Sequence, residues 1–419
     1  MTATLLLLVG LSTAAATFVA LVRVRHPSAL SFPVMMAGWL TGEYPLFHLT
    51  GQAIVAGLLI VGGALEETRG VIGIVLVVLS MLGLLRVQHV ARSAAPTAEA
   101  ALRTGLGDDY LDRLSAASRA RLRTEGDPRT SRNPVSFDRS SLTISTDIAY
   151  GPHPKRHLLD IYRPADMPAG APVVIQIHGG AWIIGHKQQQ AQPLLHRLAR
   201  SGYVCVSINY RLGPTFRFPD QIIDVKRAIA WVRENIEQHG GDPSTIILTG
   251  GSAGGHLSSL AALSAGRREL QPGFEDADTS VAGCVPFYGP PDFADRHGIR
   301  GRMAAMRPFL ERMVMPDKLA DDPESWDAVS PITHIGPHAP PFFIIQGTHD
   351  VLVWKEEARD FQTRLRDVSR RPVVYWEVPG AQHAFDTLNS VRSGAAVDAV
   401  ERFVGWVAAT STILDEEAR

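Results

Sequence analysis

The stretch Gly250-Gly251-Ser252-Ala253-Gly254 decides the expected fold of this chain. It follows the apolar residues 246–248 and precedes a run of helix-forming residues, 256–265. A serine between glycines at a strand-to-helix turn is typical of a nucleophile elbow, which exposes the hydroxyl at the N-terminus of a helix. The stretch therefore predicts that Ser252 is a nucleophile, although a G-x-S-x-G pattern alone also occurs in ordinary glycine-rich loops.

A second glycine-rich loop lies upstream. Apolar residues 172–177 predict a buried strand that leads directly into His178-Gly179-Gly180-Ala181-Trp182. Similar His-Gly-Gly loops supply backbone amides to the oxyanion hole of lipases and esterases. The amides of Gly179, Gly180 and Ala253 are therefore the expected oxyanion-hole donors. We expect His178 to order the loop, and Trp182 either to pack beside an acyl pocket or to fill the core.

Candidates for the acid and the base follow two later strands. With a serine on such an elbow, the acid and the histidine come afterwards in that order, each on a loop after a strand. Asp350 follows the apolar run 342–346, and His383 follows the run 373–378. We therefore expect His383 to take the proton of Ser252, and Asp350 to hold the imidazole in the right tautomer.

Neighbouring histidines and carboxylates fit these roles less well. His334 and His338 precede the acid strand in a proline-rich segment, and His349 has no strand end of its own. Glu356 and Glu357 begin an expected helix, where acidic side chains interact favourably with the helix dipole. We expect structural or surface roles for the three histidines, and a solvated first turn for the two glutamates.

Residues from about 140 to 409 resemble the α/β-hydrolase superfamily, in the esterase branch related to hormone-sensitive lipase and to bacterial feruloyl-esterase-like proteins. Besides the elbow, the oxyanion loop and the order of the triad, the resemblance includes four motifs: Gly185-His186-Lys187, Asn209-Tyr210-Arg211-Leu212, Phe218-Pro219 and Gly241-Asp242-Pro243. Ala181 and Gly251 depart from the hormone-sensitive-lipase pattern, which usually has a third glycine and often an acidic residue at these positions. The form present here is closer to feruloyl-esterase-like and kynurenine-formamidase-like relatives.

The resemblance implies an α/β-hydrolase fold, with a mostly parallel eight-stranded sheet flanked by helices. Apolar runs predict strands near 142–149, 157–163, 172–177, 203–209, 245–249, 281–287, 342–346 and 372–378. Helical patterns lie near 190–200, 219–238, 253–265, 355–368 and 391–409. The catalytic domain would span 140–419, with a lid-like insertion over 290–340. The apolar residues of this insertion could line an acyl pocket or form plain core: Met303, Met306, Phe309, Leu310, Met313 and Met315.

These motifs favour a membrane-anchored serine carboxylesterase, similar to lipases, that works through an acyl-enzyme intermediate. An amidase of the formamidase type, or a peptidase, would use the same triad and stays open as an alternative. A scaffold protein without activity would normally have lost a member of the triad, and all three members are present. The expected substrate is an ester, with a lipid-derived ester as one option.

Composition agrees with a globular enzyme. The chain has 419 residues and a formal net charge of −1, so its charge provides no argument for nucleic-acid binding. Cys205 and Cys284 both lie in apolar runs, which favours buried free thiols over a disulfide. No spacing of histidine and cysteine resembles a zinc site, and neither a metal nor a cofactor is expected.

Residues 1–90 are expected to form a transmembrane region of about three helices. The uncharged run 3–22 is long enough to cross a bilayer, and 46–65 is a second such run. The shorter run 70–85 would span only if its helix extends toward His89. Residues 28–45 have an interfacial or re-entrant character. Cleavage of the first run as a signal peptide is disfavoured, because no Lys or Arg precedes it.

Charge bias predicts the orientation. Arg23 and Arg25 follow the first span, and Arg86 and Arg92 follow the third. By the positive-inside rule the protein is a multi-pass protein of the cell membrane with its catalytic domain in the cytoplasm, unless a fourth span lies near residue 35. Residues 91–139 would then be a linker, either solvated or laid as a basic helix on lipid headgroups. Its possible apolar face comprises Leu106, Tyr110, Leu111, Leu114 and Leu122, and its basic side Arg113, Arg119, Arg121 and Arg123.

Overall fold

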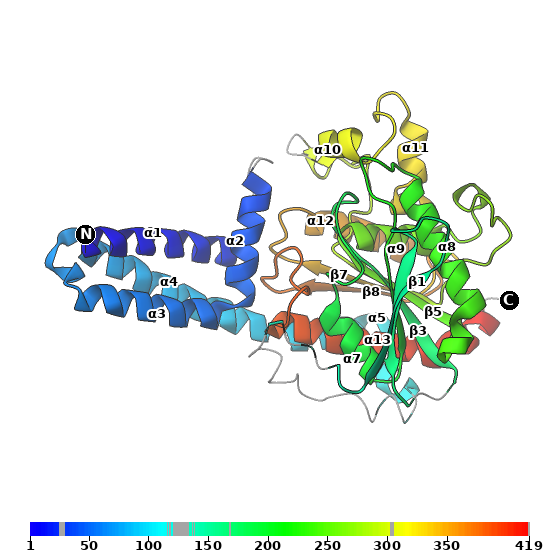
Figure 1. Ribbon diagram of the computed structural model, residues 1–419, viewed down its shortest axis with the longest axis horizontal. Coiled ribbons are helices and arrows are strands. Elements are labelled where there is room, and N and C mark those ends of the chain that lie inside the picture. The colour runs from blue at the N-terminus through cyan, green and yellow to red at the C-terminus, as the bar shows by residue number, and fades with distance from the viewer. Residues whose placement is uncertain are drawn as a thin grey trace.

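The computed structural model describes residues 1–24, 30–114, 116, 119, 134–135, 137, 139–166, 169–301 and 306–417. A bundle of N-terminal helices projects from a larger α/β part (Figure 1). The α/β part contains one sheet of eight strands in the order β1-β2-β4-β3-β5-β6-β7-β8. Antiparallel pairing joins β1 to β2 and β2 to β4, and all other neighbouring strands are parallel. The expected α/β-hydrolase fold is confirmed.

The strands agree with the apolar runs of the sequence. Their bounds are β1 Leu142–Ala149, β2 Leu158–Pro164, β3 Ala171–Ile177, β4 Val204–Ile208, β5 Gly241–Gly251, β6 Gly283–Phe287, β7 Phe342–Gly347 and β8 Val373–Val378. The central strands are buried on both faces, which is why their sequences are continuous apolar runs.

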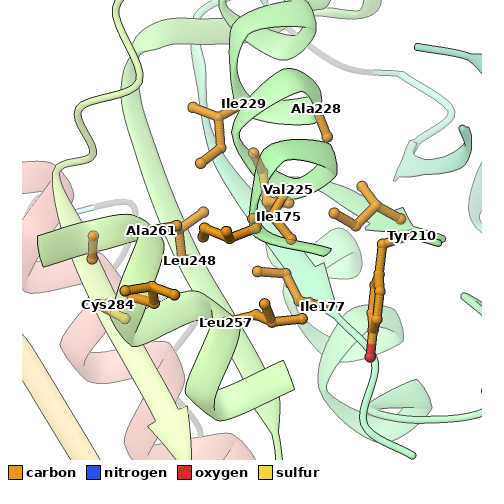
Figure 2. Close-up of a cluster of buried hydrophobic side chains, with 14 of the residues drawn as sticks. Ile175, Ile177, Tyr210, Val225, Ala228, Ile229, Leu248, Leu257, Ala261 and Cys284 are labelled. Carbon is orange, nitrogen blue, oxygen red and sulfur yellow. The ribbon is translucent and has the colours of Figure 1, made fainter. Parts of the chain in front are cut away.

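Helices cover both faces of the sheet (Figure 1). They are α7 Gln192–Arg200, α8 Asp220–Asn235, α9 Ala253–Leu263, α12 Lys355–Val368 and α13 Val391–Glu417. Successive strand residues point to opposite faces. Thus Ile175 packs with Leu248, α8 and α9 in one core cluster (Figure 2), whereas Val174 packs with α7 and α13 in a second cluster.

The segment that follows the N-terminal helices packs onto the α/β part. It forms α5 Ala94–Leu106 and the short helix η3 Tyr110–Arg113. Trp376 of β8 donates a hydrogen bond to Thr97 (3.0 Å), and Arg402 of α13 pairs with Glu99 (3.1 Å). Leu106, Tyr110 and Leu114 belong to the second core cluster, so this apolar face is covered by protein. Leu122, Arg121 and Arg123 lie outside the described residues.

The insertion between β6 and β7 contains two short helices, α10 Met306–Met313 and α11 Pro323–Ala328, and the 3-10 turn η7 Pro331–His334. Leu310 and Met315 are fully buried in the first core cluster. Met306, Phe309 and Met313 pack against that cluster and are partly buried, whereas Met303 lies outside the described residues. These residues therefore serve as core for the insertion, one of the two roles that the sequence allowed.

The N-terminal region contains α1 Thr2–Leu21, α2 Ser31–Glu43, α3 Pro45–Val61, the 3-10 turn η2 Ala64–Glu66 and α4 Thr68–Arg92. Two helices of the described chain are long and apolar enough to cross a membrane, α1 and the helix that runs from Thr68 to Leu106, or three if the pair α2 and α3 is one broken span. The third apolar helix thus extends beyond His89, as a span requires. α2 and α3 meet at a bend of 90°.

Small residues hold α1 and α4 together. A Cβ added at Gly10 would lie 2.6 Å from the Gly73 carbonyl oxygen, so the two backbones approach closely at this point. Thr17 and Ser80 are buried and hydrogen-bonded to each other (2.8 Å). Close backbone contact through glycine and hydrogen bonds between helices is characteristic of helices that associate in lipid.

Candidate active site

Ser252 lies at the turn between β5 and α9, and its backbone has φ 57° and ψ −119°. Such a positive φ is strained for a residue with a side chain, and strain of this kind is common at functional sites. The flanking glycines make the turn possible. A Cβ at Gly254 would lie 1.9 Å from the Ile177 carbonyl oxygen, and one at Gly250 would lie 2.6 Å from the same atom. The elbow geometry expected from the sequence is therefore present.

Asp350 and His383 lie on the loops after β7 and β8, and the structure brings them together. His383 Nδ1 and Asp350 Oδ2 are 2.7 Å apart, and both side chains are buried. Asp350 Oδ1 accepts hydrogen bonds from the amides of Leu352 (2.8 Å) and Val353 (2.9 Å). These two amides fix the carboxylate so that its other oxygen faces the imidazole, which leaves Nε2 as the atom able to accept a proton.

Tyr288 connects the elbow with the His383 loop. Its ring centroid lies 4.5 Å from that of His383, and its hydroxyl would lie 2.8 Å from a Cβ placed on Gly251, the neighbour of Ser252. The Tyr288 hydroxyl donates to Asp386, and burial raises the pKa of that carboxyl. No hydrogen bond joins Ser252 Oγ to His383 among the described contacts, and such bonds often tighten only when substrate binds. No motif in the sequence points to Tyr288, because its contacts come from two loops that are far apart in the chain.

The oxyanion loop departs from expectation at one position. The Gly179 amide donates a hydrogen bond to Gln190 Oε1 (2.6 Å), so it is not free to bind an oxyanion and does not keep that assignment. In the described part of the chain, the amides of Gly180, Ala181 and Ala253 have no acceptor. Gly180 and Ala181 both have positive φ, 112° and 52°. A Cβ at Gly180 would lie 2.1 Å from the Ile184 carbonyl oxygen, so only glycine fits there.

His178 orders this loop, as the sequence suggested. Its Nδ1 lies 2.7 Å from the Gly179 carbonyl oxygen, and its ring stacks on Tyr210 with centroids 4.3 Å apart. Tyr210 in turn donates to the His178 carbonyl (2.9 Å). Burial lowers the pKa of His178 to about 4. The imidazole is therefore neutral at physiological pH and has a packing role.

Trp182 belongs to a buried aromatic cluster. It is 2% exposed, and its ring meets His256 and Phe293 edge to face at 5.2 and 4.9 Å. His256 stacks on Phe293 (4.3 Å) and lies 2.8 Å from the Val329 carbonyl through Nε2. Of the two roles expected from the sequence, core packing and substrate binding, the structure shows core packing for Trp182.

The buried histidines predict a loss of stability in acid. Burial lowers the pKa of His256 to about 3, and an exposed histidine in the unfolded chain has a pKa of about 6.5. The neutral His256 side chain therefore contributes its full share to the free energy of unfolding above about pH 6.5. This share is lost as the pH falls toward 3, at up to about 1.4 kcal/mol per pH unit. Guanidinium unfolding of the full chain between pH 7 and 4, followed by tryptophan fluorescence, should show a shallower pH slope for His256→Phe. If the free energy of unfolding changes equally with pH in the wild type and in His256→Phe, the pKa of His256 is not lowered by burial.

The other histidines and glutamates near the acid and base loops make structural contacts, and one of them differs from the expectation. His349 Nδ1 faces the Ala20 carbonyl oxygen (3.2 Å), and His334 Nε2 faces the Ala328 carbonyl oxygen (2.9 Å). Glu357 is not solvated: it is 4% exposed and pairs with the buried Arg300. Sequence patterns at a helix start could not show this, because Arg300 comes from the insertion.

Among the described residues, no group of three or more His, Cys, Asp or Glu side chains could hold a metal ion. Cys205 and Cys284 are free and buried, as predicted. Burial raises the pKa of both thiols. Neither thiolate is therefore available as a nucleophile at neutral pH.

The chain is similar to known esterases over most of its length. Residues 159–365 match the BD-FAE family. The chain is 42% identical to a probable carboxylic ester hydrolase, LipM of Mycobacterium tuberculosis, over 96% of this chain and 94% of that protein. The chain belongs to the BD-FAE family of α/β-hydrolase esterases. This esterase is also 40% identical to esterase LipQ of the same organism, over 89% of this chain and 84% of that one.

Solved structures agree on the fold. A truncated carbohydrate esterase from gut microbiota superposes with a TM-score of 0.54 at 25% identity, over 65% of this chain and 99% of that one. About a third of this chain has no counterpart in that structure. Because the relatives that cover nearly the whole chain are esterases, the protein is a carboxylic ester hydrolase.

Proposed function

We propose that this protein is a membrane-anchored serine carboxylesterase in which Ser252, His383 and Asp350 form the catalytic triad. The observation that carries the proposal is the buried hydrogen bond between His383 and Asp350, at the same sheet edge as the strained turn of Ser252. Carboxyl ends of parallel strands meet at one edge, so β5, β7 and β8 deliver the three residues to one place.

Each residue then has a defined role. His383 Nε2 takes the Ser252 proton as Oγ attacks the ester carbonyl, and Asp350 stabilises the imidazolium that forms. The imidazolium then protonates the leaving alcohol, and water attacks the acyl-enzyme by the same route. We assign the oxyanion to the free amides of Gly180, Ala181 and Ala253. The N-terminus of α9 adds a favourable dipole at the same position.

The anchoring part of the proposal rests on the exposed faces of the N-terminal helices. α1, α3 and α4 present large apolar side chains on their surface, among them Leu8, Leu11, Phe18, Ile54, Leu58, Val75, Leu79 and Leu82. A continuous apolar surface of this kind is suited to lipid and not to water. We propose that α1, α3 and α4 each cross the bilayer and that α2 lies along its surface.

The charges support the orientation proposed from the sequence. The N-terminus of α1 lies at the end of the bundle away from the α/β part, so α1 and α4 both run toward the catalytic domain (Figure 1). On that side, Arg23 follows the end of α1 and Arg92 is the last residue of α4, whereas Glu66 and Glu67 lie at the opposite end. The positive-inside rule then places the catalytic domain in the cytoplasm.

The function is tested by covalent labelling and substrate profiling of the full chain in detergent micelles. A serine-directed fluorophosphonate should label Ser252, as mapped by peptide mass spectrometry, and labelling of another residue would refute the nucleophile assignment. Esters of increasing acyl length should be hydrolysed faster than the matching amides. A preference for the amides would instead support the amidase alternative.

A lipid-derived ester is the substrate class that we favour, because the catalytic domain is held against the membrane. With long-chain esters, rates should rise when the substrate is presented in the same micelles or vesicles as the protein. Rates that do not respond to the presentation of the substrate would argue against a lipid-derived ester.

A further inference from the structure

The end of α1 and one face of α2 contact the two loops that carry Asp350 and His383. Figure 1 shows α2 standing between the helical bundle and the α/β part. On the acid side, His349 Nδ1 faces the carbonyl oxygen of Ala20 at 3.2 Å. Beyond the acid loop, Arg23 forms two hydrogen bonds with Glu356 (2.6 and 2.8 Å). The membrane region is therefore bound directly beside the proposed acid and base.

Gln382 is the side chain that ties the two loops together. It is 3% exposed, and its Oε1 accepts hydrogen bonds from the amides of Val351 (2.9 Å) and His383 (3.1 Å). This single oxygen therefore binds the backbone amide of Val351, which follows Asp350, and the backbone amide of His383. Because the two loops follow different strands, this bond fixes their relative position across the sheet edge.

The other end of the Gln382 amide faces α2. A Cβ added at Gly38 of α2 would lie 3.3 Å from Gln382 Nε2 and 3.2 Å from Val19 Cγ1 of α1. Glycine at this position lets α2 approach the amide closely. A larger side chain there would press on Gln382, and through it on both loops.

A buried ion pair fixes α2 at its C-terminal end. Arg392 is 1% exposed; its Nη1 donates to the Gly42 carbonyl (2.7 Å) and pairs with Glu43 (3.2 Å), and its Nε donates to the Pro379 carbonyl (2.7 Å). Ser390 donates to the second oxygen of Glu43 (2.6 Å). Pro379 begins the loop that leads to His383. The same guanidinium therefore holds α2 and the base loop together.

We propose that Gln382 is a positioning residue for the Asp350–His383 pair, and that α2 is the support that keeps Gln382 in place. The membrane region is thereby part of the active-site scaffold and not only an anchor. This inference rests on the proposed function of Ser252, His383 and Asp350. Its physical basis is that a displacement of about 1 Å in a catalytic geometry can lower the rate by about 100-fold.

The first test is Gln382→Met, which keeps the approximate size of the side chain and removes the oxygen acceptor. Measured on the full chain in micelles with p-nitrophenyl butyrate, kcat should fall by about 10- to 100-fold with KM nearly unchanged. A merely structural role would lower the number of labelled sites and leave kcat per labelled site unchanged. Wild-type kcat per labelled site would overturn the proposal.

The second test changes only the support. Gly38→Leu places a side chain against Gln382, whereas Gly57→Leu in α3 is the matched control, because no atom lies within 4 Å of a Cβ at Gly57. The first variant should lose about tenfold or more in kcat, and the second should stay within about twofold of the wild type. Equal activity of the two variants would overturn the role of α2.

Two measurements keep the outcomes distinct. Complete labelling by a fluorophosphonate over a long incubation counts the folded sites, so kcat is expressed per labelled site and misfolding does not imitate the effect. If the wild type itself fails to hydrolyse esters or is not labelled at Ser252, the proposed function fails. If the wild type is active and the Gln382 and Gly38 variants match it, only the present inference fails.

Discussion

Ser252→Ala is expected to lower kcat for p-nitrophenyl butyrate by about 10⁶-fold, the size of effect seen when a triad serine is removed from a serine hydrolase. The variant keeps the elbow, because an alanine Cβ occupies the same place as that of serine. It removes the hydroxyl that we propose as the nucleophile. Residual hydrolysis should come from binding and from the free amides of Gly180, Ala181 and Ala253.

Ser264→Ala is a suitable control for this change. Ser264 follows α9, is 1% exposed, and its hydroxyl has no hydrogen-bond partner among the described residues. Its replacement should leave kcat within about twofold of the wild type, because the lost hydroxyl leaves no hydrogen-bond partner unpaired and Ser264 lies at the other end of α9 from Ser252. Initial rates should be measured on freshly purified full-length protein, with fluorophosphonate labelling in parallel. More than 1% residual activity in Ser252→Ala, with no contaminating esterase, would refute the nucleophile assignment.

The strands could be predicted from the sequence because the central sheet is buried on both faces. A strand such as β3, whose residues are apolar in succession, has few alternatives when a glycine turn follows it. The positions of Asp350 and His383 followed from the same logic, since each lies directly after a strand. Local pattern and global fold therefore agree for these elements.

The errors and omissions concern contacts between segments far apart in the sequence. Gly179 looked like an oxyanion donor, yet Gln190 takes its amide after the chain has turned back. Glu357 looked solvated, yet Arg300 from the insertion covers it. No sequence pattern indicates a positioning role for Gln382, because that role depends on contacts with Val351 and with α2. A periodic pattern reports which face of an element is buried and not what covers it.

Asp350→Asn should lower kcat by about 10⁴-fold, the size of effect known when the triad aspartate of a serine protease becomes asparagine. The geometry of this site explains the direction. Asp350 Oδ1 accepts from the amides of Leu352 and Val353, so an asparagine would place its oxygen there and its NH₂ group toward His383. Gln346 Nε2 also donates to Oδ2 at 3.2 Å and would meet a second donor.

The consequence for His383 is a wrong tautomer. Facing an NH₂ group, Nδ1 must accept a hydrogen bond, so the imidazole proton resides on Nε2, the atom that has to take the proton of Ser252. The base is then blocked although every side chain stays in place. Asp327→Asn is the matched control: its carboxylate is 54% exposed and pairs with Arg296 at the surface, and such pairs contribute little.

The two variants should therefore separate by activity and not by stability. Both should unfold within a few degrees of the wild type in a thermal scan followed by tryptophan fluorescence, while only Asp350→Asn loses hydrolysis. If Asp350→Asn retains kcat within tenfold of the wild type, Asp350 does not control the tautomer of His383. The hydrogen bond of 2.7 Å between them would then serve the packing of the two loops and not the proton transfer.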